Sequence, residues 1–168
     1  MSNEYNLMPL LTSTPYGVLP IAMVAATAKS VLQVATPSTT DIEVLGWGIS
    51  FNGVTSTAVP VQCELFWTAT GATVTAQSPA PWGNAMQPAS LCVSGTAATG
   101  INAGTETAPA AQVNMVDAQF VHPQSGYAVW FPEGHREKVS VSSFLRLRVT
   151  AAAVVSVIPW VVWKEPAV

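Results

Sequence analysis

At 168 residues, with 49% hydrophobic and only 9% charged side chains, the chain is long enough for one domain with its own core. An ordinary soluble domain carries about 25% charged residues, so this shortage of charge indicates a subunit of an assembly rather than an isolated monomer. Six dispersed Lys and Arg residues and a net charge of -3 exclude a nucleic-acid-binding patch, and no apolar run is long enough for a membrane span.

Residues 1–16 are predicted to form an extended N-terminal arm. Apolar side chains alternate irregularly with polar ones in this segment, and Pro9 and Pro15 oppose a helix. The arm is too apolar for a solvated tail, so we expect it to lie against its own domain or a neighbouring subunit. The first four residues lack the basic start of a signal peptide, and we therefore expect synthesis in the host cytoplasm without secretion.

Residues 17–168 are interpreted as a single domain of short β-type runs separated by turn signals. The pattern predicts strands at residues 17–28, 30–35, 41–51, 59–69, 112–121, 127–131, 139–142, 144–150 and 154–163. Residues 112–121 also fit a short helix, although their link into the next run favours a strand. This spacing predicts an all-β, two-sheet antiparallel sandwich, with a jelly roll as the expected topology and a closed barrel or an immunoglobulin-like sandwich as alternatives.

Two runs have unusual patterns. In residues 41–51 the apolar side switches near Leu45, which predicts a β-bulge at Gly46 because one extra residue re-phases a two-residue repeat. Residues 154–163 are apolar on both faces and contain Pro159, which favours an edge or a bulge. A bare edge of this kind would aggregate, so we expect a partner or the arm to cover it. Trp160 and Trp163 fall on opposite faces, and we expect one to be core and the other a contact.

The stretch 70–109 is rich in small and polar residues and is predicted to be a long loop. Trp82 lies between prolines there, as an aromatic anchor in an ordered loop would. Burial is the expected role of Trp47, Trp67 and Trp130.

The residues needed for catalysis or metal binding are not brought together by the sequence. His122 and His135 are isolated, and no G-x-S-x-G motif accompanies them. Cys63 and Cys92 lack the paired spacing of a metal site and are expected to be reduced thiols. We therefore predict no enzyme activity, no catalytic or metal-binding residue and no cofactor.

Several strand sequences carry a resemblance to a known family: SVLQVA at 30–35, EVLGWGISF at 43–51, GYAVWFP at 126–132, LRLRVTA at 145–151 and VVWKE at 161–165. With these runs the chain resembles the small β-sandwich decoration (cement) proteins of tailed-bacteriophage capsids. The resemblance implies a structural virion protein that binds the major capsid protein on the capsid exterior, as a homotrimer, and stabilises the shell without contacting nucleic acid or membrane. Another phage tail or fibre-head protein, or a carbohydrate-binding module, remains an alternative.

The predicted protein-interface residues are the apolar side chains of the arm together with three tryptophans. They are Tyr5, Leu7, Met8, Leu10, Leu11, Trp82, Trp160 and Trp163.

Overall fold

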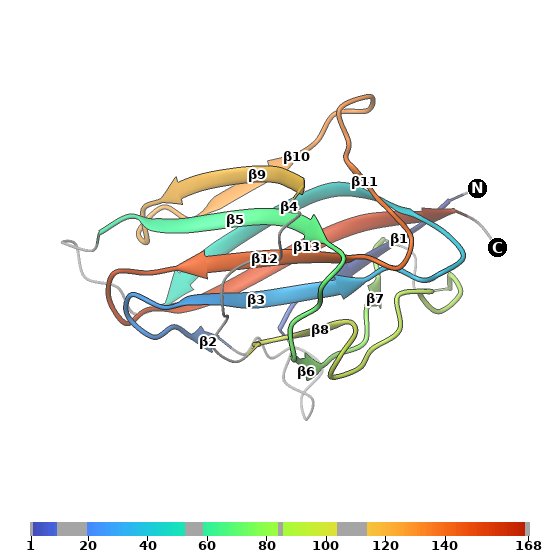
Figure 1. The fold of residues 1–168 in the computed structure, drawn as a ribbon. Helices are drawn as coiled ribbons and strands as arrows, with labels where there is room; N and C mark the ends of the chain where they lie inside the picture. Colours follow the sequence, from blue (N-terminus) through green and yellow to red (C-terminus); the bar gives the residue numbers. More distant parts are fainter. Residues whose placement is uncertain (1, 10–19, 53–58, 84–85, 104–113, 167–168) are drawn as a thin grey trace.

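The computed structural model describes residues 2–9, 20–52, 59–83, 86–103 and 114–166. In these ranges the regular structure is entirely β, and two antiparallel sheets pack against each other (Figure 1). The two-sheet sandwich predicted from the alternating pattern is therefore confirmed. None of these ranges contains a helix of the length and hydropathy that crossing a membrane requires.

The first sheet has seven strands in the order β10-β4-β13-β1-β7, with β11 beside β4 and β2 beside β13. Its strands are β1 (Ser2–Leu7), β2 (Ile21–Ala22), β4 (Ile42–Asn52), β7 (Ala80–Pro81), β10 (Tyr127–Trp130), β11 (Lys138–Val139) and β13 (Ser156–Pro166). The second sheet has six strands in the order β6-β8-β3-β12-β5-β9. They are β3 (Ala28–Ala35), β5 (Val61–Thr68), β6 (Thr75–Ala76), β8 (Gly100–Ile101), β9 (Asn114–Val121) and β12 (Phe144–Thr150).

Consecutive long strands alternate between the two sheets. The chain crosses from β3 to β4 and back to β5, and it crosses again from β9 to β10 and from β12 to β13. Strands that are distant in sequence therefore become neighbours, as β12 does between β3 and β5. This alternation is typical of a jelly roll.

The inner faces of the two sheets meet in one apolar core. The largest fully buried apolar side chains of this core come from both sheets: Tyr5, Leu7, Leu32, Trp47, Leu65, Leu145, Leu147 and Trp163. Each such side chain contributes about 1.5–3 kcal/mol by leaving water. The core alone therefore gives the chain a strong reason to fold as a sandwich.

A β-bulge interrupts β4 at Leu45, one residue before the predicted position at Gly46. Val162 of β13 pairs with Gly46 and Trp163 pairs with Val44, so Leu45 has no residue opposite it. The extra residue re-phases the strand, and the apolar side chains on both sides of the bulge consequently face the core: Ile42, Val44, Trp47 and Ile49.

The last strand, β13, lies in the middle of its sheet and not at an edge. It pairs with β4 on one side and with both β1 and β2 on the other. Pairing with β2 involves Ser156 and Val157, whereas pairing with β1 begins at Val161. Pro159 lies in the gap between these two short ladders, so its missing N–H interrupts no described pairing on that side.

The start of the predicted arm forms β1, which pairs with β13 over all six residues and with β7 over two. Residues 10–16 of the arm lie outside the described ranges. Of the strand predicted at 17–28, only Ile21–Ala22 is a separate short strand, and the run from Ala28 belongs to β3.

The long segment after β5 folds along one side of the sandwich. Its short strands β6 and β8 extend the six-stranded sheet, whereas β7 joins the seven-stranded sheet. The segment also covers Arg146, which the sequence predicted to face solvent. Arg146 is buried because its guanidinium donates to the Thr70 carbonyl (3.2 Å) and the Ser30 hydroxyl (3.0 Å) and lies over the Phe66 ring.

Candidate functional site

Three tryptophan rings lie together on the outer face of the seven-stranded sheet. Trp130 comes from β10, Trp160 from β13, and Trp82 follows β7. The ring centroids of Trp82 and Trp130 are 5.9 Å apart and those of Trp130 and Trp160 are 5.4 Å apart, with interplanar angles of 43° and 37°. Trp82 is 40% exposed and Trp130 is 51% exposed. We refer to these three residues as the tryptophan cluster.

Two glycines of β4 allow the rings to lie across the sheet. Trp130 pairs with Gly46 and Trp160 pairs with Gly48 on either side of that strand. A Cβ on Gly46 would lie 2.6 Å from the Val129 carbonyl oxygen and 2.9 Å from the Trp130 ring. A Cβ on Gly48 would lie 2.6 Å from the Trp160 ring. Both distances are well below contact, so a side chain at either position would push the rings off the sheet.

The third ring is held by the N-terminal strand. The Trp82 backbone N–H donates to the carbonyl oxygen of Glu4 in β1 (2.8 Å), next to the pairing of β1 with β7. The Tyr5 hydroxyl donates to the Pro88 carbonyl (2.9 Å) on the far side of the same loop. The loop that carries Trp82 is therefore fixed by hydrogen bonds to β1.

A shallow hollow of about 150 Å³ lies against the cluster. It is lined by Asn6, Met8, Val162 and the three tryptophans, so its walls are largely apolar. Pockets that enclose a drug-sized ligand measure about 300–1,000 Å³. The hollow therefore suits one protruding side chain of a partner better than a whole small molecule.

The eight predicted interface residues fall into three groups. Tyr5, Leu7 and Trp163 are buried in the core of this same chain. Met8, Trp82 and Trp160 line the hollow, and Leu10 and Leu11 lie outside the described residues. Trp160 and Trp163 lie on opposite faces of β13, as predicted.

The sequence interpretation missed Trp130, for which burial was expected. In β10 the side chains of Tyr127 and Val129 pack against the core, so alternation turns Trp130 outward. The two outward-facing glycines of β4 were the available signal, because a glycine in a strand often marks the close approach of another group.

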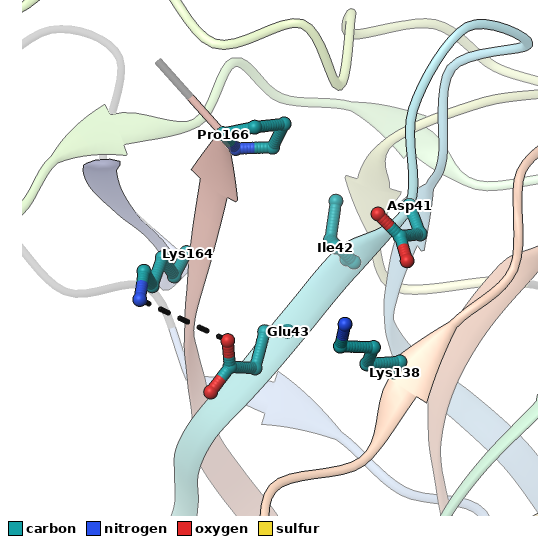
Figure 2. A pocket seen from close by; sticks show the side chains of 6 residues that line it. All are labelled: Asp41, Ile42, Glu43, Lys138, Lys164 and Pro166. Carbon is teal, nitrogen blue, oxygen red and sulfur yellow. Dashed lines mark ion pairs between the residues drawn. The ribbon is translucent and has the colours of Figure 1, made fainter. Parts of the chain in front are cut away.

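A second hollow, also of about 150 Å³, has mixed charge (Figure 2). Lys164 and Glu43 point toward each other across it, with 3.9 Å between Nζ and Oε2. The other Glu43 oxygen lies 3.4 Å from Nη1 of Arg136. Because the Glu43 carboxylate is already shared by two cations, the hollow has little unmatched charge to offer a ligand.

The described residues show no arrangement that resembles a catalytic centre. They contain no cluster of three or more His, Cys, Asp or Glu side chains that could hold a metal ion. Cys63 and Cys92 are free and buried, and burial raises the pKa of the Cys63 thiol to about 12. His135 lies in an exposed turn, while the His122 ring accepts a hydrogen bond from the Gln124 backbone.

No known protein family matches the chain, and no curated protein or solved structure is significantly similar to it. The tryptophan cluster is therefore interpreted from its own geometry and from the composition of the chain.

Proposed function

We propose that this protein is a structural binding protein that attaches to the outside of an assembled bacteriophage capsid and stabilises it. The observation that carries the proposal is the tryptophan cluster, in which partly exposed aromatic rings are held on a rigid sheet. Tryptophan is enriched among residues that dominate protein–protein binding energies, and such residues cluster near the centre of an interface. The low charge of the chain and its resemblance to decoration proteins support a protein partner, the major capsid protein.

Binding to purified, expanded capsids tests this proposal. Trp130→Ala and Trp160→Ala are expected to weaken capsid binding by about 30-fold each, because truncation of an interface anchor costs about 2 kcal/mol or more. Co-sedimentation of the protein with capsids over a concentration series measures this loss.

Val154→Ala is the control, since Val154 is 78% exposed in the turn between β12 and β13, away from the cluster. It should bind like the parent protein, and melting temperatures should show that all variants fold. The proposal fails if the parent protein does not bind capsids, or if folded Trp130→Ala and Trp160→Ala variants bind as well as Val154→Ala.

The same rings favour a second candidate, a carbohydrate-binding module. Asn6 supplies an amide beside the exposed aromatic faces, which is a combination that sugars can use. Two observations favour the protein partner instead: the rings are tilted by 37° and 43° and form no common plane, and the hollow is small. Glycan binding by the isolated chain that is lost in Trp130→Ala, without any capsid binding, would establish the second candidate.

A further inference from the structure

The strand β9 is an open edge of the six-stranded sheet. It pairs with β5 on one side from Asn114 to Val121. On its other side, the described part of the chain contains no strand that pairs with it. Alternate backbone N–H and C=O groups along eight residues therefore point outward and can pair with another strand.

The other sheet edges are much shorter. The outermost strands β6 and β7 have two residues each, and β7 ends in Pro81, which has no N–H to donate. The fourth edge strand, β10, has four residues and is followed by Pro132 and Glu133. Short strands, prolines and charges are the usual protection against edge-to-edge pairing, and β9 has none of these.

The side chains of β9 also lack outward charge. Its only charged residue is Asp117, whose carboxylate accepts hydrogen bonds from Trp47 (3.1 Å) and Tyr127 (3.0 Å) across the sandwich. Phe120 is 75% exposed and Met115 is 48% exposed on the solvent side. The strand therefore presents open backbone groups beside apolar side chains, with no charge that would repel an identical strand.

We propose that β9 pairs antiparallel with β9 of a second copy of this chain, about a two-fold axis. A second copy is the favoured occupant because each copy has the same open edge, and one isologous contact satisfies both edges at once. The contact joins the two six-stranded sheets into one continuous sheet. It uses a different surface from the tryptophan cluster and does not depend on the proposed function.

Sedimentation equilibrium of the purified full chain tests the pairing. We expect a particle of twice the 17.6 kDa chain mass. In hydrogen exchange, the β9 amides should become better protected as the protein concentration rises. Ala118→Lys places a charge at an exposed position in the middle of β9 and is expected to weaken the dimer at least about tenfold, because the two lysines would approach each other across the axis.

Val93→Lys is the matched control, since it adds the same charge at a residue that is 68% exposed and lies outside both sheets. It should leave the dimer unchanged, as should Trp130→Ala. Thermal melting should show that Ala118→Lys folds, and the concentration dependence of exchange in the parent protein needs no variant at all. A monomer at all concentrations, a mass of three chains, or a dimer that Ala118→Lys does not weaken would overturn the proposal.

Discussion

The outward face of β4 has no side chain at Gly46 or Gly48, and this determines how the tryptophan rings lie. The two positions differ in what a new Cβ would meet. At Gly48 the obstacle is the Trp160 ring, which can rotate away from the sheet. At Gly46 the nearest atom is the backbone carbonyl oxygen of Val129, and the strand β10 would have to move.

Gly46→Ala is therefore expected to destabilise the fold more than Gly48→Ala. Overpacking that displaces backbone costs about 1–3 kcal/mol, so we expect a loss in that range for Gly46→Ala and less than about 1 kcal/mol for Gly48→Ala. Denaturant unfolding measures both losses. Gly48→Ala should still change the tryptophan fluorescence, because the Trp160 ring is pushed into solvent. Equal losses of stability for the two variants would contradict this explanation.

At the scale of elements, the end of β13 holds the long loop against the sandwich through Glu165. The Glu165 carboxylate is buried and accepts hydrogen bonds from the Ser90 hydroxyl (2.5 Å), the Leu91 backbone N–H (2.8 Å) and the Trp163 indole N–H (2.9 Å). The loop carries the chain from the first sheet toward β8 of the second. This one side chain therefore fixes the loop to the last strand.

We expect Glu165→Ala to lower the free energy of unfolding by at least about 2 kcal/mol, because it leaves buried donors without an acceptor. Glu165→Gln keeps one carbonyl oxygen and should lose less. Thermal or denaturant unfolding measures the difference, with Glu133→Ala at an exposed turn as the control. Limited proteolysis between residues 86 and 94 should become faster in Glu165→Ala. Stability equal to that of the control would contradict a role for Glu165 in holding the loop.

For the molecule as a whole, Asp117 links the two sheets at the side where β9 and β10 form the edges. Its carboxylate, on β9, accepts hydrogen bonds from Trp47 of β4 and Tyr127 of β10. The pKa of Tyr127 is raised to about 12, chiefly by burial and further by the hydrogen bond to Asp117 and its charge. The folded state thus favours the protonated phenol, and the stability that this gives is lost as the pH rises from about 10 to about 12.

Asp117→Asn should lower the Tyr127 pKa while leaving it above 10, because burial, the larger cause, remains. Ultraviolet titration of tyrosinate measures the shift, and the difference from Tyr127→Phe isolates this residue from the other tyrosines. The variant should also lose less stability than the parent protein between pH 10 and 12. A Tyr127 pKa that does not change in folded Asp117→Asn would show that the carboxylate does not act on the phenol.

The sequence by itself determined the strands and their inward faces. The two-residue alternation in residues 144–150 and 61–65 predicts the buried side of β12 and β5, because successive side chains in a strand point to opposite faces. The change of phase near Leu45 likewise predicts a bulge, since a shift of one residue is visible in the local pattern. These properties depend only on neighbours along the chain.

Only the tertiary structure decided which residues meet on the outer faces. Trp82, Trp130 and Trp160 are distant in sequence, and they come together because β10 and β13 lie on either side of β4 while β1 holds the loop of Trp82. Arg146 has the alternation of a solvent-facing residue, yet Thr70 and Phe66 cover it. Strand order and the path of a long loop depend on contacts between distant segments, and a local pattern has no information about those contacts.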